Sequence, residues 1–91
     1  LEALTAQLKK DNTPVYLTVD LDCLDPSVFP GTGTPEAGGV TFPQLLTSLL
    51  LVSRTNVVGA DINELAPMLD TSGASTACAC KVLREMLLAL Y

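Results

Sequence analysis

An apolar segment that ends in two carboxylates constrains the fold of this chain most strongly. The segment runs from Val15 to Asp22 and reads Val-Tyr-Leu-Thr-Val-Asp-Leu-Asp. In an extended chain alternate side chains share a face, so Asp20 and Asp22 would point the same way. Two anions about 5 Å apart repel each other by about 3 kcal/mol at an effective dielectric constant of about 20. A metal ion would offset this repulsion, and a solvated strand end is the alternative.

Hydrophobic spacing divides the chain into five expected elements. The order is a helix over residues 1–10, a strand over 15–19, a helix over 42–53, a strand over 57–60 and a helix over 74–90. Thr41 and Gln44 have the spacing of a capping box ahead of the second helix. Strands that are apolar on both faces are typical of parallel sheets covered on both sides. The pattern therefore predicts an α/β fold with parallel strands joined by right-handed crossovers.

A long loop, from Asp25 to Gly39, follows the first strand and is rich in proline and glycine. This density of proline and glycine excludes regular structure and predicts a surface loop of fixed shape. Loops of this length in compact domains are usually functional or disordered, and the prolines favour order. Asp25 precedes Pro26, so it fits a turn-forming role, with metal ligation as the alternative.

Four acidic residues are expected at one edge of the sheet. Asp20 and Asp22 follow the first strand, and Asp61 and Glu64 follow the second. Ligand sites of open α/β sheets lie beyond the carboxyl ends of the strands. Asp61 fits either a cap on a backbone turn or a group that orients a ligand. Glu64 fits either a plain surface carboxylate or recognition of a cation.

The ligand types favour a hard cation and exclude histidine chemistry. Oxygen ligands select ions such as Mg²⁺ or Mn²⁺, and two carboxylates alone hold them weakly. The chain contains no histidine, so further ligands or a histidine base would have to come from elsewhere. Of the three cysteines, Cys78 and Cys80 are expected to pack in a helix, and Cys23 beside the carboxylates is ambiguous.

Composition limits the partners and the compartment. The net charge of −5 and pI near 4.2 argue against nucleic acid and anionic membranes and suit a cationic substrate. No apolar run approaches the roughly 20 residues that span a bilayer, and an odd number of cysteines favours a reducing, cytoplasmic location. The chain has 91 residues and is 48% hydrophobic, so we expect part of a larger domain or a subunit that needs partners.

The signature around the aspartate pair narrows the enzyme classes. A haloacid-dehalogenase-type phosphatase would continue with Gly-Thr, where this chain has Cys23 and Leu24, and a glycosyltransferase Asp-x-Asp is too unspecific to exclude. The segment Thr18–Gly39 closely resembles the signature of the ureohydrolases, the arginase and agmatinase family. After the aspartates it contains, in order, Pro26, Pro30-Gly31, Thr32-Gly33-Thr34-Pro35 and Gly38-Gly39.

A second segment, Gly59–Pro67, looks like the second acidic segment of the same family. The Pro-Gly-Thr-Gly-Thr-Pro-Glu loop resembles agmatinase more than arginase, whose loop usually begins Pro-Ala-Thr. The resemblance implies hydrolysis of agmatine to putrescine and urea. Arginase, guanidinobutyrase, formimidoylglutamase and a non-catalytic truncated module are the alternatives.

The resemblance also implies a set of residue roles. Two manganese ions are expected, with Asp20 bridging both and Asp22 chelating one. A hydroxide that bridges the ions would attack the guanidinium carbon. Glu64 would pair with the guanidinium of the substrate, and Thr34 would lie close to it. Asp61 would lie beside the metals, behind their direct ligands.

As a whole, residues 1–91 resemble the C-terminal portion of one three-layer α/β/α domain of this family. The histidines and remaining aspartates of the metal site are expected in a preceding half that this chain lacks. Alone, the chain is therefore expected to be inactive. The resemblance further implies a small cationic guanidino substrate and a homo-oligomer, a trimer or hexamer, for the complete protein.

Overall fold

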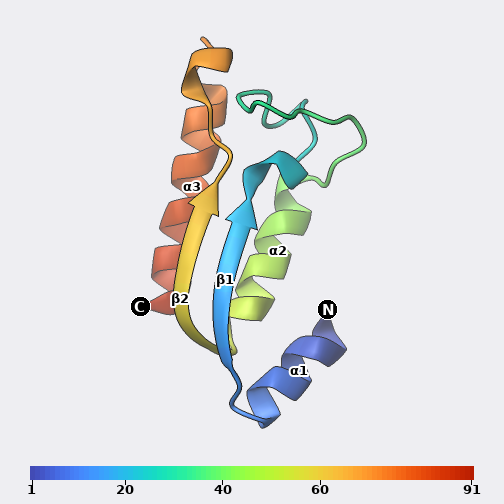
Figure 1. The fold of residues 1–91 in the computed structure, drawn as a ribbon, viewed down its shortest axis with the longest axis vertical. Coiled ribbons are helices and arrows are strands. Elements are labelled where there is room, and N and C mark those ends of the chain that lie inside the picture. The colour runs from blue at the N-terminus through green and yellow to red at the C-terminus, as the bar shows by residue number, and fades with distance from the viewer.

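The computed structural model describes all 91 residues and contains a two-stranded parallel sheet with three helices (Figure 1). The helices and strands are α1 (Glu2–Lys10), β1 (Pro14–Asp20), α2 (Phe42–Ser53), β2 (Asn56–Asn63) and α3 (Ala74–Leu90). Short 3₁₀ turns cover Leu21–Cys23 and Pro67–Leu69. The predicted α/β class and the parallel sheet are therefore confirmed.

Local sequence signals account for the helix that joins the strands. Thr41 accepts a hydrogen bond from the backbone N–H of Gln44, and the Gln44 side chain accepts one from the backbone N–H of Thr41. This reciprocal capping box confirms the predicted start of α2. Leu45 and Leu49, one helical turn apart, are the two buried residues of α2 and turn the same face of the helix inward.

β2 is longer than predicted. The expected strand covered residues 57–60, whereas pairing with β1 continues through Thr18 opposite Asp61 and Asp20 opposite Asn63. Asp61 therefore lies inside the strand and not after it. The end of the strand was missed because Asp61 and Asn63 are polar. On the exposed face of the sheet both side chains form a hydrogen bond with Thr18 of β1.

Both long helices pack against one face of the sheet. The core joins Val19 of β1 to Leu45 and Leu49 of α2 and to Val82 and Met86 of α3. On the opposite face the Tyr16 side chain is 62% exposed. Coverage on both faces, which the apolar strands predicted, is thus not found within these residues, because α1 packs beside α2 instead.

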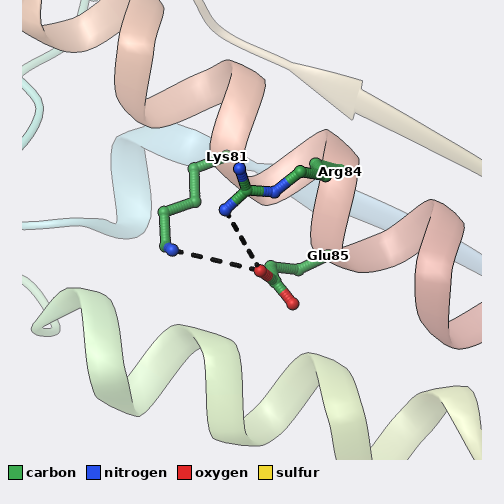
Figure 2. Close-up of polar contacts among 3 residues, drawn as sticks. All are labelled: Lys81, Arg84 and Glu85. Atoms are coloured by element: carbon green, nitrogen blue, oxygen red, sulfur yellow. Dashed lines mark hydrogen bonds and ion pairs between the residues drawn. The ribbon is translucent and has the colours of Figure 1, made fainter.

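The polar side of α3 carries two ion pairs. Lys81 lies 3.9 Å from the Glu85 carboxylate, and Arg84 lies 3.4 Å from it (Figure 2). These exposed ion pairs contribute at most about 1 kcal/mol each.

A large apolar surface remains uncovered. A groove of about 550 Å³ lies between β2 and α3, and its lining is almost entirely hydrophobic. No helix of the structure is long and apolar enough to cross a membrane.

Candidate metal and substrate site at the carboxyl ends of the strands

The parallel pairing brings the predicted acidic residues to one end of the sheet. Asp20 ends β1 and lies opposite Asn63, which ends β2 and precedes Glu64. Both arrowheads point to the same end, where the long loop and the segment after β2 also gather (Figure 1). The structure therefore places Asp20, Asp22 and Glu64 along a common edge, as expected for a parallel sheet.

Asp22 reaches this edge by a different backbone path from the one predicted. β1 ends at Asp20, and Asp22 lies in the 3₁₀ turn Leu21–Cys23. The alternation of side chains along β1 therefore ends at Asp20 and does not extend to Asp22. The turn forms because Leu21 is fully buried in the core, which pulls the chain out of the extended path directly after the strand.

Thr34 contacts the candidate metal ligand Asp22. Its hydroxyl donates a 2.8 Å hydrogen bond to Asp22 Oδ2 across twelve residues of sequence. The bond fixes the carboxylate and leaves its other oxygen open to a ligand. The structure therefore joins two residues that the sequence placed in separate roles.

Asp61 is held by side chains on the exposed face of the sheet. It accepts hydrogen bonds from Tyr16 Oη at 2.9 Å and Thr18 Oγ1 at 2.7 Å, and a third from the Asn63 amide. These bonds lower the pKa of Asp61, and the hydrogen bond to Asp61 raises the pKa of Tyr16. Asp61 is therefore an anion held in a fixed position next to the site edge. Its partners are side chains, so it does not cap a backbone turn.

Glu64 has an unusual backbone conformation. Its φ of +82° lies in the left-handed region, shared among non-glycine residues only by Asn12. Such a conformation costs about 1–3 kcal/mol and is found mainly where the surrounding structure imposes it, often at functional sites. The side chain of Glu64 is exposed and belongs to neither ion pair of the structure. The carboxylate is therefore free to face a cation.

The residues present fit part of a metal site. Asp20 and Asp22 offer the oxygen ligands that Mn²⁺ or Mg²⁺ prefers. No cluster of three or more histidine, cysteine, aspartate or glutamate side chains lies together in the structure. An octahedral ion at these aspartates would thus need further ligands from outside the chain.

The cysteines do not complete the ligand set. Burial and the nearby Asp22 carboxylate raise the pKa of Cys23, which keeps it a thiol, and burial raises the pKa of Cys78. Cys78 packs against the core as predicted, whereas Cys80 is exposed in the apolar groove. The packing prediction is therefore wrong for Cys80 within this chain, because nothing covers that side of α3.

Asp25 has the structural role that its place before Pro26 suggested. It accepts hydrogen bonds from the backbone N–H groups of Ser27, Gly38 and Gly39 and from the Ser27 hydroxyl. Leu24 and Val40 form a parallel bridge beside it. A Cβ on Gly39 would lie 2.5 Å from the Asp25 nitrogen, so only glycine fits there. Asp25 thus closes the loop and shapes it.

Two further residues support the site and were not singled out from the sequence. Asp70 accepts hydrogen bonds from the N–H and hydroxyl groups of both Ser72 and Ser75, ahead of α3. Ser75 is fully buried and also bonds the backbone of Gly31 in the long loop. An aspartate shortly before an apolar helix is a signal for a helix start, and it could have identified Asp70.

The two loop aspartates predict how stability depends on pH. Hydrogen bonds from Ser27 and from Ser72 and Ser75 lower the pKa values of Asp25 and Asp70 from 3.8 to about 2. A depressed folded-state pKa gives stability that is complete above the unfolded pKa and is lost as the pH falls through the folded value. The free energy of unfolding is therefore expected to fall between about pH 5 and pH 2.

Chemical denaturation at a series of pH values would measure this loss. In the Asp25→Asn/Asp70→Asn variant the curve should be flatter across the same window, because asparagine does not titrate. An equally steep decline in both proteins would contradict the assignment.

Comparison with known proteins agrees with this geometry. The arginase family matches residues 1–89 of the chain. Agmatinase of Bacillus anthracis is 50% identical over 91 residues, which cover 97% of this chain and 31% of that protein. The chain therefore spans about a third of the length of this curated relative.

Solved structures give the same result for the fold. Proclavaminate amidino hydrolase from Streptomyces clavuligerus superimposes with a TM-score of 0.83 at 32% identity, covering 96% of this chain and 30% of that one. Arginase from Bacillus caldovelox superimposes with a TM-score of 0.81 at 31% identity, covering 93% of this chain and 29% of that one. Sequence and fold lead to the same conclusion: this chain belongs to the arginase family.

Proposed function

We propose that residues 1–91 form part of the active site of a manganese-dependent hydrolase of guanidino compounds, with agmatine as the substrate and putrescine and urea as the products. One observation carries the proposal. Asp20, Asp22 and Glu64 lie at or directly after the carboxyl ends of the two paired strands, Asp20 and Asp22 within the ureohydrolase signature and Glu64 within the second acidic segment. The agmatinase relative at 50% identity supports agmatine as the substrate.

The roles follow from the chemistry of the side chains. Asp20 and Asp22 would hold manganese together with ligands from outside this chain, and Thr34 keeps Asp22 in place. Manganese, when bound, would supply a water molecule of lowered pKa as the nucleophile. Glu64 would bind the guanidinium group, because a carboxylate can accept two parallel N–H hydrogen bonds from it. The net charge of −5 favours approach of a cation.

The fixed anion at Asp61 supports this arrangement from below. Its oxygens already accept hydrogen bonds from Tyr16, Thr18 and Asn63, so it acts on the site through its charge and through Asn63 and not as a direct ligand. A negative charge behind a metal site strengthens the binding of the cation in front of it. We therefore assign Asp61 a supporting role.

Other family members and a non-catalytic role remain as second candidates. Arginase, guanidinobutyrase and formimidoylglutamase would use the same aspartates with a different pocket for the substrate tail. A non-catalytic module is favoured by one observation, the absence of a third metal ligand among the 91 residues. The complete protein is proposed to be a cytoplasmic homo-oligomer, a trimer or hexamer.

A hybrid enzyme tests the proposal. In it, residues 1–91 replace the matching segment of Bacillus anthracis agmatinase, which supplies the remaining two thirds of the fold. With Mn²⁺ the hybrid enzyme should release urea from agmatine faster than from arginine, whereas the 91-residue chain alone should release none. Release of urea is measured with both substrates, with and without added Mn²⁺.

The outcomes separate the candidates. Faster release from arginine would replace agmatinase by arginase. A folded hybrid enzyme that binds manganese but releases urea from no guanidino compound would refute hydrolysis by this site. A folded hybrid enzyme that also binds no manganese would favour the non-catalytic module.

A further inference from the structure

We propose that Ser75 is a positioning residue that locks the long loop carrying Thr34 to the segment carrying Glu64. The inference rests on the proposed function and adds a residue outside the ureohydrolase signature. Ser75 lies in the first turn of α3, its side chain is fully buried, and it lies outside the set of acidic residues at the edge of the sheet.

The hydroxyl of Ser75 uses both of its hydrogen-bonding capacities. Its oxygen accepts a bond from the Gly31 N–H at 2.8 Å, and its proton goes to Asp70 Oδ2 at 2.6 Å. Asp70 also accepts a bond from the Ser75 N–H at 2.9 Å. A serine that is buried and bonded on both sides is costly to replace, because alanine would leave the N–H group of Gly31 unpaired.

Gly31 also forms a hydrogen bond with the segment that follows β2. Its carbonyl oxygen accepts a 2.7 Å hydrogen bond from the Ala66 N–H. Ala66 follows Glu64 by two residues, and Thr34 follows Gly31 by three. One backbone unit therefore joins α3, the long loop and the segment of Glu64. We call the three residues Gly31, Asp70 and Ser75 the loop clamp.

The loop clamp is closely packed. A Cβ built on Gly31 would lie 2.7 Å from the Cβ of Ser75 and 3.1 Å from that of Asp70. The next residue, Thr32, is only 2% exposed. The loop therefore cannot shift relative to α3 without breaking these contacts. Because Thr34 belongs to the same loop, such a shift would also displace Thr34 from Asp22.

Such a connection matters because Thr34 and Glu64 both lie beyond the paired residues of the sheet, which end at Asp20 and Asn63. In the proposed function both segments act on the same guanidinium group, since Asp22, which Thr34 holds, would bind the metal and Glu64 would bind the group directly. A displacement of about 1 Å in such a site can lower a rate by about 10²-fold. Holding the relative position of the two segments is thus a requirement of the proposed chemistry.

Ser75→Ala in the hybrid enzyme tests the loop clamp, with Ser72→Ala as the matched control. The Ser72 hydroxyl donates to the same aspartate at 2.6 Å, and its hydrogen bonds go to Asp70 and Ala74 and not to the long loop. Ser75→Ala is expected to lower kcat about 10- to 100-fold, with a smaller change in KM. Ser72→Ala should stay within about twofold of the parent, because the loop keeps its bond to Ser75.

Amide hydrogen exchange gives a readout that does not depend on activity. In Ser75→Ala the amides of Gly31 and Ala66 should exchange at least about tenfold faster, while the amide of the buried Val82 in α3 should keep its rate. Equal acceleration at Val82 would indicate general destabilisation and overturn the proposal. Unchanged exchange at Gly31 and Ala66 would overturn it as well.

The remaining outcomes distinguish the loop clamp from the proposed function. Faster local exchange with unchanged kcat and KM would show that the loop clamp does not position the site. A parent hybrid enzyme that releases no urea would refute the proposed function, and the exchange rates would still decide whether the loop clamp exists. If Ser75→Ala does not fold, Asp70→Asn takes its place, because it keeps the side-chain volume and removes one accepting oxygen.

Discussion

Replacing Asp20 and Asp22 together by asparagine in the hybrid enzyme is expected to abolish measurable urea release and to lower its manganese content. Asparagine keeps the volume of aspartate but loses the negative charge that hard divalent cations require. Loss of a group behind a metal ligand already costs about 10- to 100-fold, so loss of two direct ligands should exceed that range. Urea release per enzyme and metal content by atomic emission are the two measurements.

A matched substitution shows whether the effect is specific. Asp11 directly follows α1, is exposed and accepts a hydrogen bond from Gln7, remote from the carboxyl ends of the strands. Asp11→Asn should leave both measurements unchanged. Full turnover and a normal manganese content in the double variant would remove the basis of the proposed function.

Replacing Phe29 by alanine is expected to cost about 3–5 kcal/mol of stability, the range found for fully buried phenylalanine. Phe29 belongs to the long loop, yet its side chain has no exposed surface and is part of the core. A domain of 91 residues has a total stability of about 5–14 kcal/mol. The substitution should therefore remove a large part of the stability, and urea denaturation followed by circular dichroism would measure it.

Phe42 provides the control for this prediction. It is the only other phenylalanine, lies at the start of α2 and packs against the core while remaining partly exposed. Phe42→Ala should cost clearly less, because less apolar surface is lost and solvent can fill the space. If the two variants were equally destabilised, the long loop would not be anchored in the core as described.

The helices could be predicted from the sequence almost to the residue, because the signals are local. The capping box at Thr41 and Gln44 fixes the start of α2, and the spacing of apolar residues fixes the extent of α3. β2 was predicted too short, because its last residues are polar on the exposed face of the sheet. Asp61 and Asn63 belong to the strand through their pairing with β1, which no local pattern reveals.

The candidate site was predicted as a set of residues but not as a set of contacts. The acidic residues at the ends of the strands follow from the rule for parallel sheets. The bond from Thr34 to Asp22 and the bond from Gly31 to Ser75 join residues 12 and 44 positions apart, so they depend on the tertiary structure. The left-handed backbone of Glu64 is equally invisible in the sequence, since glutamate rarely adopts it.

The expected second layer of helices shows a different limit of sequence patterns. The apolar residues on both faces of the strands predict that something covers both faces, but they do not say which polypeptide segment does so. Here α2 and α3 cover one face, and Tyr16 on the other face stays exposed. The pattern thus indicates that the second face is suited to burial, and the chain itself spans about a third of the length of the curated agmatinase relative.

The open edges of the two-stranded sheet affect the tendency of the isolated chain to aggregate in solution. β1 and β2 pair only with each other, so each strand has an outer edge of unpaired N–H and C=O groups. Along β2 this edge carries Val57, Val58, Ala60 and Ile62 without a lysine or proline, the gatekeeper residues that protect natural sheet edges from aggregation. At high concentration the isolated chain should therefore form strand-to-strand aggregates, and a lysine introduced at position 58 should delay their formation.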